Sequence, residues 1–117
     1  MKNEITCVFT LALGEGKFPA FRDLVARIVR ATHLEPDTLS YVYSVSADEK
    51  SAHIVERYRT DALVSHVDNT FAPFAETFLS LATISSLTVY GEPDAAIKQR
   101  LDPFGAVYMQ PFDGFTR

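Results

Sequence analysis

The chain has 117 residues, of which 47% are hydrophobic and 22% are charged, and it carries a formal net charge of -4 with a pI near 5.2. This length fits one globular domain, and the composition excludes a disordered or fibrous chain. The acidic balance argues against a nucleic-acid partner, because proteins that hold phosphate backbones present a basic surface.

Three further features of the sequence bear on where the protein works. Cys7 is the only cysteine, so no intrachain disulfide can form. No basic segment followed by an apolar run opens the chain as a secretory signal would. The hydrophobic stretches end well before the roughly 20 residues that a membrane span needs. We therefore expect a cytoplasmic protein without a membrane partner.

The first predicted strand runs from residue 5 to residue 13, where hydrophobic side chains occupy every second position. Residues 14–16, Gly-Glu-Gly, then predict a tight turn. An amphipathic helix follows, with hydrophobic residues at spacings of three and four from Phe18 onwards. It should end near residues 32–33, because Pro36 disfavours helical geometry in the residue before it.

Alternating hydrophobic residues also predict two strands over residues 39–45 and 53–59. The polar run at 48–51 separates them, so we expect a hairpin.

A second helix is expected to begin at Thr60 or Asp61, because either side chain can accept a hydrogen bond from the free amides at a helix start. Pro73 should kink or restart this helix, which then continues towards Thr83. Residues 84–90 predict the last core strand.

The C-terminal part, residues 94–117, is interpreted as an extension of a domain that spans residues 1–93. Its first segment, 94–101, fits a short capped helix. The remainder has no clear period, but it is too hydrophobic for a solvated tail. We expect it to pack on the core or on a dimer partner.

The order of elements, β-α-β-β-α-β, predicts an α+β fold of the ferredoxin-like type, with both helices on one face of an antiparallel sheet. The second face then needs a cover. Tyr41, Tyr43, Tyr58 and several aliphatic residues lie on the strands, so we expect this face to pack on a second copy of the chain. The prediction is a homodimer.

Two segments carry a resemblance to a known family. Residues 54–74 combine a strand ending in Glu-Arg-Tyr, a Thr-Asp turn, and a helix with Ala62, Leu63, His66 and Phe71. The preceding segment 35–41, Glu-Pro-Asp-Thr-Leu-Ser-Tyr, is similar to a Glu-Pro-Gly loop that leads into the second strand of that family. Over residues 3 to 92 the chain resembles the antibiotic biosynthesis monooxygenase family of dimeric α/β barrels.

This resemblance implies a ferredoxin-like protomer that dimerises through its sheet and holds a pocket between sheet and helices. Enzymes of the family commonly oxidise quinols or polycyclic phenols with dioxygen and without a metal or flavin, while relatives on the same fold degrade haem. Two positions depart from the family pattern: Tyr58 stands where many members have Trp, and Asp37 stands where they have Gly.

His66 and Glu56 are the predicted catalytic residues. His66 lies about one turn inside the second helix, and histidine is the side chain best suited to exchange protons near neutral pH. Glu56 shares a strand face with Ile54 and Tyr58, so it could orient His66 or accept a substrate hydroxyl. The alternatives are a His66 that lies on the helix surface or is capped by a carboxylate, and a Glu56 paired with Arg22, Arg27 or Arg57.

Aromatic residues are the predicted substrate contacts, since they can stack on an aromatic molecule and donate hydroxyl hydrogen bonds. This set comprises Tyr41, Tyr43, Tyr58 and Phe71. The alternative is that the tyrosines only fill an interface.

We expect neither a metal nor another cofactor. The three histidines show no short metal-ligand spacing, and no cysteine cluster supports them. The turn at 14–16 lacks the third glycine of a dinucleotide site. Cys7 lies within a strand pattern, where a buried and inert thiol is expected.

Two hypotheses of function follow. In the first, the chain is a cofactor-independent oxygenase of a phenol or quinol, in which His66 helps to deprotonate the substrate while Tyr41, Tyr58 and Glu56 place it. In the second, it is a non-catalytic dimeric barrel that binds a small apolar metabolite or serves as an assembly module. A cavity filled by its own side chains would favour the second.

Overall fold

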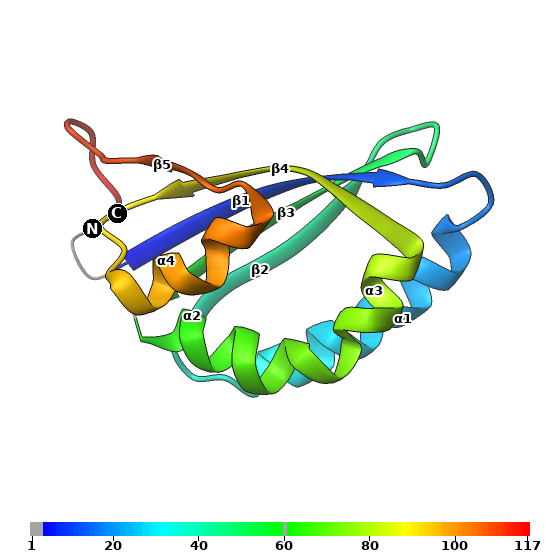
Figure 1. Cartoon of the computed structure of the whole chain (residues 1–117), viewed down its shortest axis with the longest axis horizontal. Coiled ribbons are helices and arrows are strands. Elements are labelled where there is room, and N and C mark those ends of the chain that lie inside the picture. The colour runs from blue at the N-terminus through cyan, green and yellow to red at the C-terminus, as the bar shows by residue number, and fades with distance from the viewer. Residues whose placement is uncertain (1–3, 60) are drawn as a thin grey trace.

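The alternating hydrophobic residues near the N-terminus form strand β1 (Glu4–Leu13), the central strand of one five-stranded sheet. The computed structural model describes residues 4–59 and 61–117. Figure 1 shows the sheet as one layer, with the helices gathered as a second layer on one of its faces. Side chains of β1 at every second position, from Ile5 to Leu13, point into the space between the two layers.

The sheet has the strand order β2-β3-β1-β4-β5. Strands β2 (Thr38–Val45) and β3 (Ser51–Arg59) form the predicted hairpin, and β3 and β4 (Ala82–Tyr90) flank β1, all antiparallel. This arrangement confirms the ferredoxin-like prediction. The fifth strand, β5 (Val107–Met109), was not predicted; it pairs parallel with β4, so the sheet is mixed.

Helix α1 (Phe18–His33) ends at the position predicted from Pro36, near residues 32–33. It buries Phe21, Leu24 and Ile28 against the sheet, while its arginines lie on the opposite side. The spacing of these hydrophobic residues therefore describes the buried stripe correctly.

The second helical region has four parts, where the sequence predicted one kinked helix. It consists of α2 (Ala62–Ser65), the π-helical segment η1 (His66–Phe71), the 3-10 turn η2 (Ala72–Phe74) and α3 (Ala75–Leu81). Pro73 has no amide hydrogen to donate into a regular helix, which accounts for the change of geometry around it.

The predicted start of this helix is only partly described. Asp61 occupies the position before α2, and its side chain makes no capping hydrogen bond. Thr60, the other predicted cap, lies outside the described residues. At the far end, β4 begins at Ala82, two residues before the predicted strand.

The C-terminal extension packs on the core of its own chain. Its helix α4 (Ala95–Leu101) is capped by Asp94, whose carboxylate accepts a hydrogen bond of 2.9 Å from the amide of Ile97. Ile97 and Leu101 are almost fully buried, in the same hydrophobic cluster as β1 and β4. After the 3-10 turn η3 (Asp102–Phe104), the chain returns along the sheet edge as β5.

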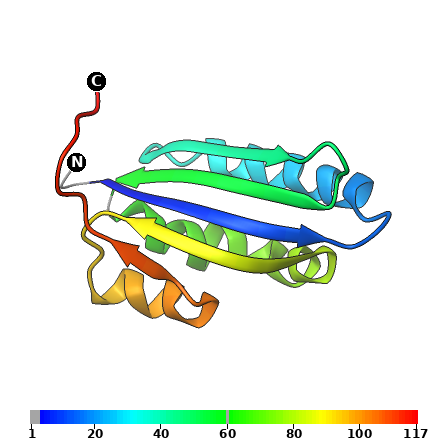
Figure 2. The same ribbon diagram turned by 90° about the horizontal axis from the view of Figure 1, so that it is seen from above.

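The two faces of the sheet differ from the prediction in one respect. Tyr41, Tyr43 and Tyr58 lie on the helix-covered face, not on the face that needs a cover, and Tyr58 is completely buried. The error arose because these strands carry hydrophobic residues on both faces. The open face, seen in Figure 2, exposes Val42, Val55, Tyr90, Val107 and Met109.

Across residues 4–59 and 61–117, none of the helices combines the length and the hydrophobicity needed to cross a lipid bilayer.

Candidate functional site

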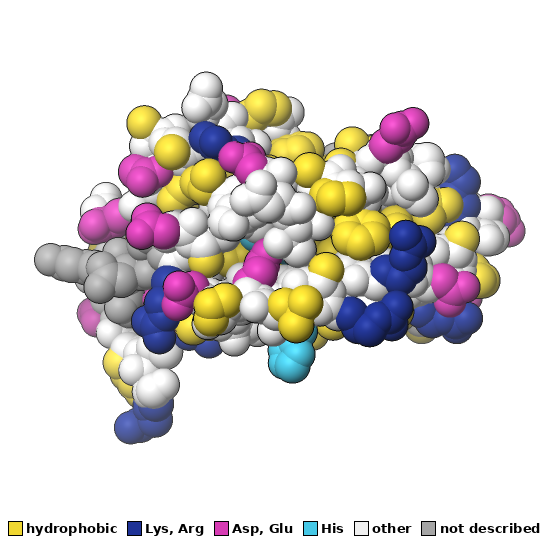
Figure 3. Space-filling view, turned by 90° about the horizontal axis from the view of Figure 1, so that it is seen from below, with side chains coloured by type: hydrophobic (Ala, Val, Ile, Leu, Met, Phe, Trp, Pro, Cys, Tyr) yellow, Lys and Arg dark blue, Asp and Glu magenta, His cyan; other side chains and the backbone are white. Residues whose placement is uncertain are grey.

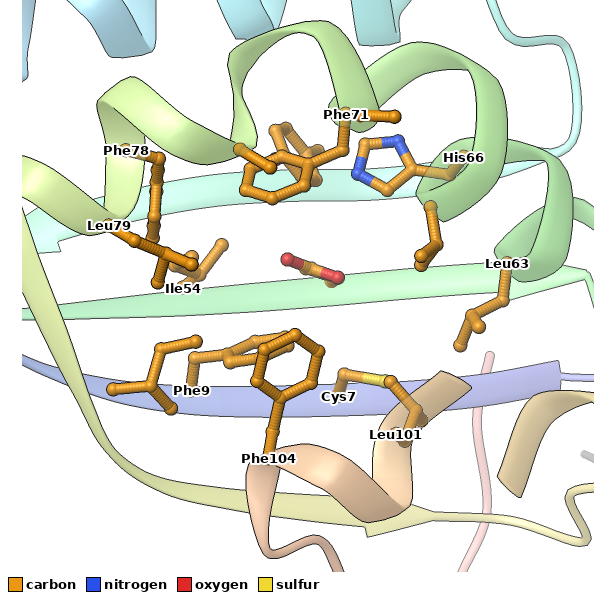
Figure 4. A pocket seen from close by; sticks show the side chains of 16 residues that line it. Cys7, Phe9, Ile54, Leu63, His66, Phe71, Phe78, Leu79, Leu101 and Phe104 are labelled. Carbon is orange, nitrogen blue, oxygen red and sulfur yellow. The ribbon is translucent and has the colours of Figure 1, made fainter. Parts of the chain in front are cut away.

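A cavity of about 240 Å³ lies between the sheet and the helices. Its walls come from β1, β2, β3 and β4, from the helical stretch 62–81, and from α4 and η3 of the C-terminal extension. Most of the lining is hydrophobic, and Figure 4 shows Phe9, Ile54, Phe71, Phe78 and Phe104 turned towards a common space. The side chains with polar atoms in this lining are those of Cys7, Tyr41, Glu56 and His66.

The cavity opens between α3 and η3. Leu79 is 51% exposed and Phe104 is 37% exposed, although both line the cavity. Figure 3 looks onto the helix-covered side and shows hydrophobic side chains at the surface across its middle, with Lys and Arg side chains towards both ends. Exposed hydrophobic side chains therefore connect the cavity with the surface at this point.

The register of the sheet explains how the polar floor is assembled. Tyr41 of β2 lies opposite Glu56 of β3, and Glu56 lies opposite Cys7 of β1. Residues that are directly opposite on neighbouring strands point to the same face. The three side chains thus form a row beneath the helices, and His66 approaches this row from η1.

His66 is held by a carboxylate that the sequence did not single out for this role. Its Nδ1 lies 3.1 Å from Oε2 of Glu35, in the loop after α1, and Glu35 also accepts a hydrogen bond of 2.5 Å from the Thr38 hydroxyl. Burial lowers the pKa of His66, and the nearby Glu35 carboxylate opposes this without reversing it.

The imidazole is therefore neutral at pH 7. We assign its hydrogen to Nδ1, the nitrogen that faces the carboxylate. Figure 4 shows the other nitrogen directed towards the cavity and Phe71. With its lone pair free, Nε2 can accept a proton from a bound molecule.

Glu56 has the opposite character. It is 6% exposed, and the Tyr58 hydroxyl donates a hydrogen bond of 2.6 Å to its Oε1. Burial raises the pKa of Glu56 to about 8; the hydrogen bond from Tyr58 opposes this rise, and the negative charge of Glu35 adds to it. At pH 7 the neutral carboxylic acid predominates, and its second oxygen has no hydrogen-bond partner within the described part of the chain.

An aromatic shell surrounds the imidazole. The Tyr41 ring lies 5.1 Å from the His66 ring between centroids, with Tyr58 at 5.5 Å and Phe71 at 6.3 Å. Tyr41 and Tyr43 share a hydrogen bond of 2.8 Å between their hydroxyls. Burial raises the pKa of Tyr41, Tyr43 and Tyr58, so all three hydroxyls remain protonated.

The structure separates the predicted site residues into two groups. His66, Glu56, Tyr41 and Phe71 line the cavity. Tyr43 and Tyr58 lie behind this lining and contact it through Tyr41 and Glu56.

The expected partners of the two central residues are different in the structure. Glu35, not Glu56, orients His66. Glu56 is not paired with an arginine either, since Arg57 forms its ion pair with Glu4 at 2.9 Å. The expected buried thiol is present: Cys7 is fully buried, and burial raises its pKa.

The sequence did not mark Glu35 as a site residue, although it is the first residue of the segment 35–41, which carries the family resemblance. The sequence also did not mark the part of the lining that comes from Phe104 in the extension. Within the part of the chain that the structure describes, no three His, Cys, Asp or Glu side chains are grouped closely enough to hold a metal ion.

The chain is similar to several solved structures over most of its length. MupZ from Pseudomonas fluorescens shares 21% identity, with 100% of this chain and 91% of MupZ covered at a TM-score of 0.88. SnoaB from Streptomyces nogalater, a cofactor-independent oxygenase, shares 18% identity over 80% of this chain and 96% of its own, with a TM-score of 0.67. Rv0793 from Mycobacterium tuberculosis shares 23% identity over 80% of this chain and 98% of its own, with a TM-score of 0.65.

A protein from Deinococcus radiodurans, described as a candidate antibiotic biosynthesis monooxygenase, shares 21% identity over 78% of this chain and 94% of its own, with a TM-score of 0.65. No family model matches the sequence, and no curated protein matches it either. The predicted protomer fold, that of the antibiotic biosynthesis monooxygenases, is confirmed by these likenesses.

Proposed function

We propose that the chain is a cofactor-independent oxygenase that acts on a small phenol or quinol. The observation that carries the proposal is His66, a neutral imidazole that is fixed through Nδ1 by Glu35 and turns its free nitrogen to an apolar cavity. The likeness of fold to SnoaB supports this chemistry, because SnoaB is a cofactor-independent oxygenase.

In the proposed reaction, His66 removes the phenolic proton, and the resulting phenolate transfers electrons to dioxygen more readily than the phenol does. A carbon–oxygen bond forms at a ring carbon that carries hydrogen, and the proton held by His66 moves to the outer oxygen to give a hydroperoxide. Loss of water from this hydroperoxide gives a quinone, so that one oxygen atom of dioxygen enters the product and the other leaves as water. The substrate supplies all four electrons.

Glu56 and Tyr41 place the reactants. As a neutral acid, Glu56 donates a hydrogen bond to the reduced oxygen, and Tyr58 fixes its orientation from behind. Tyr41 packs on His66 and presents its ring to the cavity. Tyr58 thus acts through Glu56 and does not touch the substrate.

The size of the cavity restricts the substrate. Its volume, about 240 Å³, lies below the range of about 300–1,000 Å³ that is usual for drug-sized ligands. A one- or two-ring phenol or quinol fits this space better than a tetracyclic one.

The test is oxygen uptake by metal-free protein with a panel of one- and two-ring quinols. We expect turnover above the uncatalysed rate, and a loss of about 100-fold or more in His66→Gln. His33→Gln is the matched control, because His33 is exposed at the end of α1. Unchanged turnover in His66→Gln would remove His66 from the mechanism.

The proposed enzyme is a homodimer. Its open sheet face exposes hydrophobic residues from β2, β3, β4 and β5, and the C-terminal segment adds Phe112 and Phe115 at 98% and 77% exposure. A face of this kind is typical of a surface that another chain covers. A stable monomer in sedimentation at micromolar concentration would contradict this part of the proposal.

The alternative function, a non-catalytic barrel, is less well supported. It would be favoured by a cavity that is closed or filled by its own side chains, whereas this cavity is open between Leu79 and Phe104.

A further inference from the structure

We infer that the same cavity has a second, redox-neutral activity, the enolisation of small cyclic ketones. His66 removes a proton from the carbon next to the carbonyl group, and Glu56 donates a hydrogen bond to the carbonyl oxygen. The inference uses the same two residues as the proposed oxygenase, but no dioxygen takes part. Its outcome can therefore be separated from that of the proposed function.

The geometry gives each of the two groups one fixed side and one free side. In His66, Glu35 occupies Nδ1 and the other nitrogen faces the cavity. In Glu56, Tyr58 occupies Oε1, while the other oxygen has no partner among residues 4–59 and 61–117. A base and an acid are thus oriented by neighbours that do not themselves line the cavity.

The protonation states suit this reaction. Burial favours the neutral form of both groups, lowering the pKa of His66 and raising that of Glu56. A neutral carboxylic acid in an apolar site can donate a hydrogen bond to an enolate oxygen, whereas a carboxylate would repel it. The other ionisable groups around Glu56 are Tyr41, Tyr58, Cys7 and Glu35, and burial keeps the first three protonated.

The step is balanced without a co-reactant. The carbon–hydrogen bond breaks, its proton moves to Nε2 of His66, and its electron pair forms the carbon–carbon double bond of the enolate. The charge on oxygen is stabilised by Glu56. When the proton returns to carbon from solvent-exchanged His66 in D₂O, the ketone gains deuterium and is otherwise unchanged.

The hydrophobic lining and small volume select an apolar ketone of one or two rings. 2-Tetralone is a suitable probe, because it is a fused bicycle with acidic hydrogens next to its carbonyl. 2-Naphthol, which has the shape of its enol, is the matching inhibitor.

The experiment follows deuterium incorporation into 2-tetralone by NMR, without oxygen, in D₂O near neutral pD. We expect wild-type exchange well above the buffer rate, a fall of about 100-fold in His66→Gln and a fall of about tenfold in Glu56→Gln. His33→Gln and Glu76→Gln, which change exposed residues, should exchange as the wild type does.

A second measurement covers the case in which His66→Gln does not fold. Saturating 2-naphthol should abolish exchange by the wild type, since it occupies the same two hydrogen-bonding groups. Wild-type exchange at the buffer rate, or exchange that persists with 2-naphthol bound, would overturn the inference. If the protein exchanges deuterium into 2-tetralone but takes up no oxygen with the quinol panel, the enolisation is supported and the oxygenase is refuted.

Discussion

At the residue scale, burial sets the protonation of the two central groups of the cavity. Glu56, a carboxyl that is ordinarily ionised at pH 7, is mostly neutral, and His66 is neutral although Glu35 touches it. Glu56 can therefore act as an acid in place of a carboxylate, and His66 can act as a base in place of a histidinium.

The first prediction concerns the pH dependence of turnover. Activity requires neutral His66 and protonated Glu56, so kcat/KM should rise through the pKa of His66, below 6.5, and fall at about pH 8. In Glu56→Gln the alkaline limb should disappear, because the amide does not titrate. Rates measured from pH 5 to pH 10 check this, and an unchanged alkaline limb in Glu56→Gln would assign it to another group.

The second prediction concerns stability. The unfolded chain releases the Glu56 proton near pH 4.5, whereas the folded chain keeps it up to about pH 8. The folded state therefore binds more protons in this window, and its stability falls as pH rises through it. Relative to Glu56→Gln, the wild type should lose on the order of 3 kcal/mol between pH 5 and pH 8.5. Urea unfolding of both proteins measures the difference, and parallel curves would show that Glu56 is not perturbed.

The sequence predicted some residues of the site better than others. Strand alternation was enough to place Glu56 and Tyr58 on one face, and both are buried there. The pairing of His66 with Glu35 could not be read from a pattern, because 31 positions separate the two residues and Glu35 lies in a loop without periodicity.

At the element scale, the helical region 62–81 and the C-terminal extension determine the shape of the cavity. The π-helical segment η1 begins at His66 and ends at Phe71, and both residues line the cavity. Such segments occur frequently at functional sites. Pro73 predicted an irregular helix here. The form of the irregularity depends on how the following residues pack on the sheet.

The third prediction tests whether the extension belongs to the core. Ile97 of α4 is 1% exposed and packs in the cluster formed by β1 and β4. Ile97→Ala should reduce the free energy of unfolding by about 2–5 kcal/mol, the usual cost of such a cavity. Gln99→Ala, an exposed change on the same helix, is the control. Equal unfolding midpoints for the two variants would mean that α4 is a dispensable appendage.

Strand β5 could not be predicted from the sequence. Its three residues are too few to display a period of two, and they are positioned by pairing with β4. The hydrophobic character of the tail indicated that it covers something, but not that it joins the sheet.

At the scale of the whole molecule, the order of the first four strands follows from the sequence, because two helices after the first and third strands strongly restrict the topology. The faces of the sheet were harder to assign, since β2 carries Val42 on one face and Tyr41 and Tyr43 on the other. Only packing decides which side the helices cover.

The fourth prediction tests the proposed dimer. Val55, on the open face, is 39% exposed, and Val55→Lys would place a charge within the interface. We expect this variant to sediment as a folded monomer at concentrations where the wild type is dimeric. Leu34→Lys, which changes a residue 83% exposed, should not alter the assembly. A wild-type monomer, or a dimer in both variants, would rule out this interface.

The proposed oxygenase site is tested by turnover of a one- or two-ring phenol by metal-free protein under ¹⁸O₂, with mass spectrometry of the product. We predict a quinone that contains one ¹⁸O atom, formed by the wild type and by His33→Gln but at most at about one hundredth of that rate by His66→Gln. Product without the label, or labelled product formed equally by His66→Gln, would contradict the assignment of this cavity as an oxygenase site.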